Sequence, residues 1–303
     1  MPWLAHAVNL PDGLTARPLT ATDVDDVIAM INACERHDTG ELMWEREDLI
    51  ADSSSDGFDP EHDWIGVFDG DRCVAWAMVL QRRRTFVDVH PDMRRRGIGS
   101  ALQDWAVDRV RALGGAYASQ TIDDRRTDVV SALQAAGYTP RFTSWVLRMD
   151  HPVPPKPVPP DGITLRAFRP ADETELLAMF EEAFSEFEDR PPSSAGTWRA
   201  MTTRREGFRN EDMIVAVDGE RIVGGAFLIR SAGSIWVDKF AVHRDYRHRG
   251  IARAMLAAAF ARSHELGSSF TELNTDSRTG ALSFYERIGM HIRLSYTNWA
   301  LDL

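Results

Sequence analysis

An internal repeat is the feature of this sequence that most restricts its fold. The segment GLTARPLTATD, which starts at Gly13, resembles GITLRAFRPAD, which starts at Gly162. At the same spacing, DWIGVFDGDRCVAWAMVL from Asp63 resembles DMIVAVDGERIVGGAFLI from Asp212, and each half closes on an apolar segment with a tryptophan, SWVLRM and NWALDL. Landmarks that recur in the same order indicate two copies of one fold.

A proline-rich segment separates the two copies. HPVPPKPVPPDG, from His151 to Gly162, favours an extended chain, because proline fixes its own backbone and cannot continue a helix or a central strand. We therefore expect an N-terminal domain at residues 1–150, a linker at residues 151–161 and a C-terminal domain at residues 162–303.

Each half predicts an α+β fold, in which strands and helices are mixed. Asp69-Gly70 and Asp218-Gly219 each lie between two apolar runs, which is typical of a β-hairpin. A stripe of apolar residues at helical spacing follows each arginine-rich segment, from Ile98 and from Ile251. We expect two tandem domains, each a mostly antiparallel mixed sheet flanked by helices.

Composition excludes several classes of protein. A net charge of −11 disfavours binding to nucleic acid, which requires a basic face. No apolar run is long enough to cross a membrane, so we expect no membrane association and a cytoplasmic location. Cys34 and Cys73 are the only cysteines, and no histidines have metal-ligand spacing, so we expect neither a disulfide framework nor a metal. His90 and His243 recur at the same motif position, which indicates a shared structural role.

Two segments have the residues of an anion site. DVHPDMRRRGIGSAL starts at Asp88 and AVHRDYRHRGIARAM starts at Ala241, and both lead from a strand into a helix. A helix N-terminus presents free N–H groups, glycines let these approach a diphosphate closely, and arginines add charged hydrogen bonds. The segments lack the Gly-Lys-Ser/Thr of a P-loop, and Leu102 replaces the third glycine of a dinucleotide motif. The alternative is that the arginines only solvate a helix start.

Both segments resemble the signature of the GNAT acetyltransferase family, which is Arg or Gln, two residues, Gly, one residue, then Gly or Ala. In that family the loop binds the pyrophosphate of acetyl-CoA, the acetyl donor. The resemblance implies cofactor-binding residues in both halves: Arg94, Arg95, Arg96, Gly97, Ile98, Gly99 and Ser100, and Val242, Arg247, His248, Arg249, Gly250, Ile251 and Ala252.

The resemblance also distinguishes the two halves. In ELNTDSRTGALSFYERIGM it implies that Asn274 binds the cofactor or orients the following helix, and that Tyr285 is the general acid that protonates the departing thiolate. Aligning Gly137 with Gly289 places Leu133 opposite Tyr285. We therefore expect catalysis in the C-terminal half and a catalytically degenerate N-terminal half, although Tyr285 could instead be a core aromatic residue.

Two acidic residues are candidates for the base that accepts the proton of the amine. Asp238 and Glu272 lie on the strands that should flank the acetyl group, where backbone N–H groups around Phe240 to Val242 would polarise the carbonyl. Each could equally lie at the surface or in an ion pair. A cluster of acidic residues after the first helix of the second half suggests an acidic entrance for a cationic amine or, alternatively, a solvated helix face: Glu181, Glu182, Glu186, Glu188 and Asp189.

We therefore expect an acetyl-CoA-dependent N-acetyltransferase that acts on a primary amine of a small molecule by direct attack. The tandem architecture with a degenerate first half is similar to that of the mycothiol synthases, GNAT enzymes that acetylate a cysteinyl amine. The alternative from another class is a non-catalytic acyl-CoA-binding or regulatory protein. The sequence leaves the acceptor and the oligomeric state, monomer or homodimer, open.

Overall fold

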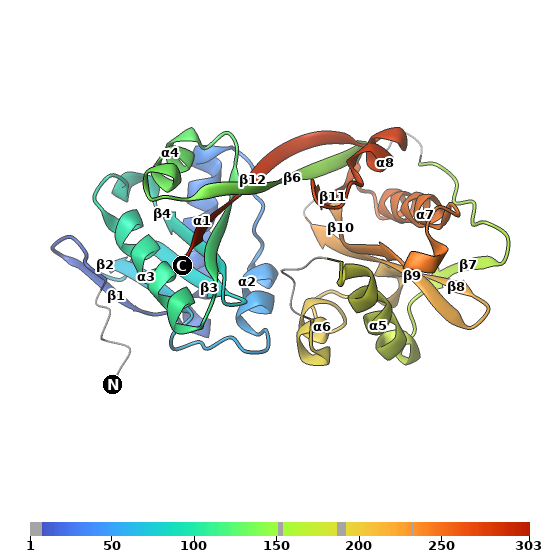
Figure 1. Cartoon of the computed structure of the whole chain (residues 1–303), viewed down its shortest axis with the longest axis horizontal. Helices are drawn as coiled ribbons and strands as arrows, with labels where there is room; N and C mark the ends of the chain where they lie inside the picture. Colours follow the sequence, from blue (N-terminus) through green and yellow to red (C-terminus); the bar gives the residue numbers. More distant parts are fainter. Residues whose placement is uncertain (1–7, 151–153, 187–191, 232) are drawn as a thin grey trace. The chain divides into compact units, whose positions relative to one another are not determined.

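A computed structural model describes residues 8–150, 154–186, 192–231 and 233–303, and part of the expected linker lies outside this range. The chain forms two compact units (Figure 1). Unit 1 comprises Met1–Phe142 and Tyr296–Leu303, and unit 2 comprises Thr143–Ser295. Within the described residues, no helix is both long and apolar enough to cross a membrane.

Unit 1 is a mixed sheet with helices on both faces, and its strand order is β1-β2-β3-β4-β5-β12. Neighbouring strands are antiparallel except β4 and β5, which are parallel. The strands are β1 (Leu14–Pro18), β2 (Trp64–Asp69), β3 (Arg72–Leu80), β4 (Arg84–Val89), β5 (Tyr117–Asp123) and β12 (His291–Asp302). The helices are α1 (Val24–Asp38), α2 (Arg46–Ser53), α3 (Ile98–Ala112) and α4 (Thr127–Ala135).

Unit 2 repeats this plan in the order β7-β8-β9-β10-β11-β6, with β10 and β11 parallel. The strands are β6 (Thr139–Asp150), β7 (Ile163–Ala167), β8 (Met213–Asp218), β9 (Arg221–Ser231), β10 (Ser234–Val242) and β11 (Phe270–Asp276). The helices are α5 (Glu173–Phe184), α6 (Ala195–Met201), α7 (Ile251–Glu265) and α8 (Leu282–Arg287).

The central strands explain why the apolar runs are continuous. In β3, Trp76 and Met78 pack toward α1, whereas Ala75 and Ala77 pack in the cluster that contains residues of α3. A strand that is buried on both faces needs apolar residues at successive positions. The expected hairpins are confirmed, because Gly70 and Gly219 occupy the turns with φ of 59° and 58°. The predicted fold, a mostly antiparallel mixed sheet flanked by helices, is confirmed for both copies.

The last strand of each half of the sequence completes the sheet of the other unit. In β6, the residues from Ser144 to Asp150 pair with β11 in unit 2, and in β12, the residues from Tyr296 to Asp302 pair with β5 in unit 1. In Figure 1, the dark red end of β12 lies among the blue and green elements of unit 1. The repeat boundaries at 150 and 162 therefore describe the duplicated sequence, whereas the spatial units exchange one strand.

Candidate functional site

The two glycine-rich loops have the same backbone conformation. Gly97 and Gly250 cap the N-termini of α3 and α7 with φ of 83° and 87°. A Cβ added at either glycine would meet no atom within 4 Å, so the left-handed backbone, and not lack of space, favours glycine there. Arg95 and His248, two residues earlier, also have positive φ, of 59° and 62°. Strained residues that recur at equivalent positions indicate a site, and the free N–H groups of the helix starts suit an anion.

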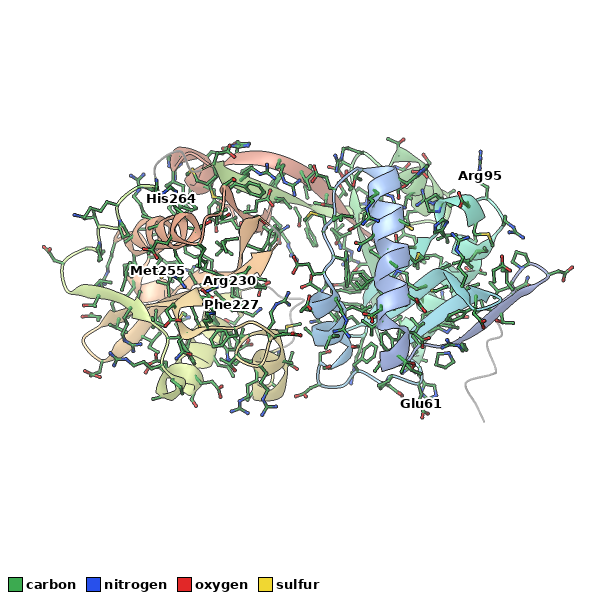
Figure 2. All side chains as sticks on the ribbon, turned by 180° about the vertical axis from the view of Figure 1, so that it is seen from behind. Glu61, Arg95, Phe227, Arg230, Met255 and His264 are labelled. Atoms are coloured by element: carbon green, nitrogen blue, oxygen red, sulfur yellow. The ribbon has the colours of Figure 1, made fainter. Side chains whose placement is uncertain are left out.

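Several loop side chains lie at the surface. Arg95 and Arg96 in unit 1, and His248 and Arg249 in unit 2, are exposed, and Figure 2 shows the Arg95 side chain extending away from the ribbon. Ile98 and Ile251 are instead buried beneath the helix starts. A Cβ at Gly99 would lie 3.6 Å from Val89 Cγ2, an ordinary contact, so this position has room for the alanine that the other loop has at Ala252. Ser100, in the first turn of α3, is exposed.

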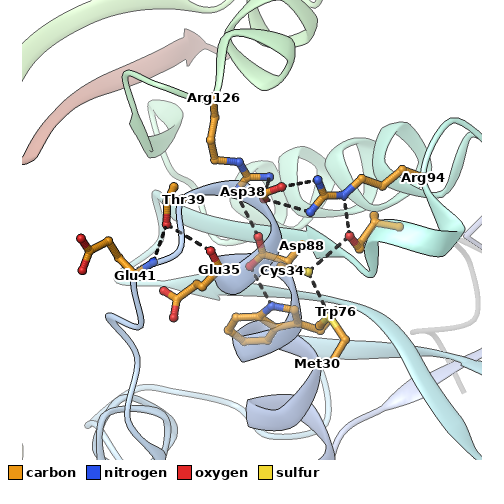
Figure 3. Close-up of polar contacts among 11 residues, drawn as sticks. Met30, Cys34, Glu35, Asp38, Thr39, Glu41, Trp76, Asp88, Arg94 and Arg126 are labelled. Atoms are coloured by element: carbon orange, nitrogen blue, oxygen red, sulfur yellow. Dashed lines mark hydrogen bonds and ion pairs between the residues drawn. The ribbon is translucent and has the colours of Figure 1, made fainter. Parts of the chain in front are cut away.

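The first arginine of each loop joins it to the preceding strand. In unit 1, Arg94 Nε donates to the Val89 carbonyl at 2.9 Å, and its Nη2 donates to Asp38 Oδ2 at 2.9 Å (Figure 3). Asp38 is buried and also pairs with Arg126 Nη2 at 3.0 Å. Arg126 Nη1 lies 3.5 Å from Asp88 Oδ1, so two arginines and two aspartates form one network. This network immobilises Arg94.

The corresponding arginine of unit 2 has a weaker arrangement. Arg247 Nε lies 3.4 Å from the Val242 carbonyl, and its Nη1 pairs with Glu186 Oε1 at 2.9 Å. The Glu186 side chain is 57% exposed, whereas that of Asp38 is 8% exposed. Because exposed ion pairs contribute little free energy, a bound anion can displace Glu186 more readily than Asp38.

In each unit the two parallel strands diverge, β10 from β11 in unit 2 and β4 from β5 in unit 1. In unit 2, β10 pairs with β11 only from Ser234↔Phe270 to Val237↔Leu273. In unit 1, β4 pairs with β5 at Arg84↔Ser119. Beyond these pairs the facing backbone groups no longer form a ladder, so they can bind an extended ligand. In unit 2 the divergence coincides with a bulge at Asp238, where the register with β9 shifts between Val237 and Lys239.

Tyr285 lies in the apolar core next to this divergence. Its ring is 6.4 Å from that of Phe240, on the segment of β10 that has left β11, and 5.2 Å from that of Phe284. Within the described part of the chain, no group hydrogen-bonds to its hydroxyl. Burial raises the pKa of Tyr285 to about 12, so the phenol keeps its proton at neutral pH.

Leu133 occupies the equivalent position in unit 1. The Tyr138 N–H donates to the Leu133 carbonyl at 3.0 Å, as the Met290 N–H donates to the Tyr285 carbonyl at 3.1 Å. Leu133 is buried in the core beside α3. Unit 1 therefore lacks a phenol at this position of the backbone.

The two candidate bases differ in their surroundings. Among the residues that the structure describes, Asp238 pairs with its neighbour Lys239 alone, at 2.6 Å, and its side chain is 30% exposed. Glu272 is buried and pairs with Arg148 Nε of β6 at 3.0 Å, and also with Arg293 of β12. The Glu272 carboxylate is thus held by two arginines, whereas the Asp238 side chain is more exposed.

The remaining predicted residues have clear positions. Asn274 is exposed on β11, directly after the last residue that pairs with β10. His90 and His243 each cap a short 3₁₀ helix, because Nδ1 accepts the backbone N–H two residues later, at 3.3 Å and 3.2 Å. The shared structural role of the two histidines is confirmed.

The described members of the acidic cluster have partners. Glu182 pairs with His243 at 2.8 Å and with Arg244 at 2.9 Å, and Glu181 accepts the Ser193 N–H at 3.1 Å. Of the described acids, Glu182 and Glu186 thus hold the segment from His243 to Arg247 that leads into the loop of unit 2, and this favours the ion-paired interpretation for these two. Glu188 and Asp189 lie outside the described residues.

Sequence reasoning missed the partners of these groups. Asp38 and Arg126 fix the loop of unit 1, and Arg148 and Arg293 hold Glu272. No local motif marks them, because each is far from its partner along the chain.

Comparisons with known proteins agree with this geometry. A model of the acetyltransferase (GNAT) family matches residues 24–138, and a model of the acetyltransferase (GNAT) domain matches residues 209–290. The mycothiol acetyltransferase of Salinispora arenicola (strain CNS-205) is 30% identical over 227 residues, which cover 70% of this chain and 70% of that protein. The chain belongs to the GNAT acetyltransferase family. It is a tandem member that resembles mycothiol synthase, as the sequence predicts.

Solved GNAT structures have the same tandem fold. A GCN5-related N-acetyltransferase from Sphaerobacter thermophilus aligns with a TM-score of 0.76 and 30% identity, and the match covers 97% of both chains. A tandem GNAT protein from the clavulanic acid biosynthesis pathway aligns with a TM-score of 0.71 and 18% identity over 95% of this chain and 98% of that one, which is a likeness of fold.

Proposed function

We propose that unit 2 transfers an acetyl group from acetyl-CoA to a primary amine of a small molecule, by direct attack of the amine on the thioester. The observation that carries this proposal is the combination of the Gly250 loop, the divergence of β10 from β11 and the buried phenol of Tyr285 in one unit. Unit 1 has the loop and the divergence but has Leu133 in place of the phenol.

The loop and the divergence suit the donor. The first turn of α7, from Ile251, offers free N–H groups to a diphosphate, and Arg247 and Arg249 supply positive charge beside it. The unpaired edge of β10 from Lys239 to Val242 offers backbone groups to the amides of the pantetheine chain and an N–H to the carbonyl. When bound, the donor supplies the thioester.

Tyr285 and Asp238 carry the protons in this proposal. The neutral phenol of Tyr285 donates a proton to the departing thiolate, and Asp238 takes the proton of the amine, directly or through water. Asp238 is preferred over Glu272 because Glu272 is held by Arg148 and Arg293.

The relatives suggest one acceptor in particular. The proteins from two Salinispora species that match this chain are named mycothiol acetyltransferase. A cysteinyl amine, the acceptor expected from the resemblance to mycothiol synthase, is therefore our first candidate for the acceptor.

A second reading is that the chain binds acyl-CoA without transfer. It is favoured by unit 1, which has the loop but no phenol opposite Tyr285. A pure binding protein would not need a proton donor at Tyr285, so the two readings differ in what that residue does.

The test is to mix the full chain with acetyl-CoA and a panel of amines that includes a cysteinyl amine, and to follow the release of free thiol. We expect amine-dependent release. Tight binding of acetyl-CoA in calorimetry without release from any amine in the panel would favour the binding protein.

A further inference from the structure

Three core positions differ in polarity between the units. Unit 2 has Leu256 on α7, Leu273 on β11 and Met290 before β12, and all three belong to one apolar cluster. The equivalent residues of unit 1, counted from the matching glycines and strands, are Gln103 on α3, Gln120 on β5 and Tyr138 before β6. Three positions that hold leucine or methionine in unit 2 thus hold polar residues in unit 1.

The three polar residues form a hydrogen-bonded chain. Gln120 Nε2 donates to Gln103 Oε1, and Gln103 Nε2 donates to the hydroxyl of Tyr138. Gln120 is 4% exposed and Tyr138 is 3% exposed, and burial raises the pKa of Tyr138 to about 12. Burying polar groups costs free energy unless they are bonded, and an apolar set already packs well in unit 2. Packing alone therefore does not account for the hydrogen-bonded chain of Gln103, Gln120 and Tyr138.

The hydrogen-bonded chain of side chains lies between the Gly97 loop and the point where β4 and β5 diverge. Gln103 is in the second turn of α3, the helix that Gly97 caps. Gln120 directly follows Ser119, the residue of β5 that pairs with β4. A ligand whose diphosphate lies on the start of α3 and whose other end enters the divergence passes these residues.

The tyrosines of the two units have exchanged backbone positions. Unit 1 has Leu133 and Tyr138 where unit 2 has Tyr285 and Met290, and in each unit the second residue donates its N–H to the carbonyl of the first. Both tyrosines lie in the core that faces α3 or α7. In unit 2, the residues that correspond to the polar chain share one core cluster with Tyr285.

Gln120 retains unused hydrogen-bonding capacity. Its amide has two N–H groups and an oxygen, and its one bond within the described residues is the N–H donated to Gln103. Its oxygen is not among the unbonded side-chain atoms that are sealed from solvent. One N–H and the oxygen of Gln120 therefore have no partner within the described residues.

We infer that Gln120 binds the carbonyl of an acyl-CoA thioester in unit 1, with Gln103 and Tyr138 as positioning residues, and so distinguishes the thioester from free CoA. The inference rests on the proposed binding of CoA by such a loop. Free CoA has no carbonyl at its sulfur, so it leaves the second N–H of Gln120 without an acceptor. Because Leu133 replaces the phenol, unit 1 retains this ligand and does not transfer its acyl group.

The experiment isolates unit 1 in the full chain. Gly250→Glu blocks the loop of unit 2 with a strained backbone and a negative charge, and calorimetry then measures binding of acetyl-CoA and of CoA. We expect acetyl-CoA to bind about tenfold more tightly than CoA, the value of one buried hydrogen bond. Gln120→Met, which keeps the length of the side chain, should bring this ratio close to one.

The second variant installs the residues of unit 2. Gln103→Leu, Gln120→Leu and Tyr138→Met together should also remove the preference for acetyl-CoA, and circular dichroism and melting temperature show whether the fold survives. If both variants still bound acetyl-CoA more tightly than CoA, the three polar side chains would serve only core packing, and the inference would be overturned. Absence of binding in the Gly250→Glu protein would overturn it too, whereas thiol release by the unaltered chain tests the proposed function separately.

Discussion

Units 1 and 2 have nearly the same loop but different surroundings. In unit 1, Arg94 is fixed by the buried Asp38, the polar side chains of Gln103 and Gln120 lie beside Tyr138 in the core at α3, and Leu133 replaces the phenol. In unit 2, Arg247 pairs with the exposed Glu186, and Tyr285 lies beside the diverging strands. Under the proposed function, the comparison teaches that the loop motif would mark where a diphosphate binds, whereas the side chains at the divergence would decide whether transfer follows.

The largest expected effect is that of a block in the loop of unit 2. Gly250→Glu places a strained backbone and a carboxylate at the anion site, so we expect thiol release to fall at least about hundredfold, which corresponds to about 3 kcal/mol. Gly97→Glu, its counterpart in unit 1, should lower turnover far less and remove one binding site in calorimetry. Equal losses of turnover would contradict the assignment of catalysis to unit 2.

Removal of the phenol should separate chemistry from binding. We expect Tyr285→Phe to lower kcat about hundredfold with little change in acetyl-CoA affinity, because a positioned proton donor acts only on the chemical step. Tyr117→Phe, in unit 1, is the matched control. An unchanged kcat in Tyr285→Phe would remove this residue from the mechanism.

The two arginine pairs should differ in their contribution to stability. Asp38→Asn removes the carboxylate that pairs with Arg94 and leaves Arg126 only the longer contact with Asp88, and we expect the free energy of unfolding to fall by about 3 kcal/mol. Glu186→Gln breaks an exposed pair and should cost less than about 1 kcal/mol. Denaturant unfolding measures both, and similar values would mean that the loops are held alike.

A buried acid should make the stability of unit 1 depend on pH. Burial raises the pKa of Glu35 to about 7 from a reference of 4.5, although the backbone N–H groups of Met43 and Trp44 oppose this. Asp88 also raises this pKa, and Arg126 lowers it.

Because the folded state keeps this proton where the unfolded chain has lost it, the free energy of unfolding falls as pH rises from 4.5 to about 7. Glu35→Gln should remove this trend and stabilise the protein by about 2 kcal/mol at pH 8, with little change at pH 4. Parallel pH profiles of the two proteins would show that Glu35 does not titrate in this range.

The smallest effect is expected inside the loop itself. Gly99→Ala adds a Cβ at an ordinary distance from Val89, so the free energy of unfolding should change by less than about 0.5 kcal/mol. Gly97→Ala forces a side chain into a φ of 83° and should cost about 1 kcal/mol. If both changes were tolerated equally in thermal melts, the left-handed conformation of the cap would not matter.

The sequence alone determined the features that depend on local chemistry. The hairpins follow from Asp-Gly pairs, the loops from glycines before a helix, and the contrast between Tyr285 and Leu133 from the alignment of the two copies. Each of these depends on residues close together in the chain, so the pattern contains the information.

Only the tertiary structure decided the pairings between distant segments. It showed that β6 and β12 each complete the sheet of the other unit, that Asp38 binds Arg94, and that Glu272 is held by arginines from β6 and β12. The physical reason is that ladder hydrogen bonds and buried ion pairs form between whichever groups the fold brings within about 3 Å, and sequence spacing does not specify those neighbours.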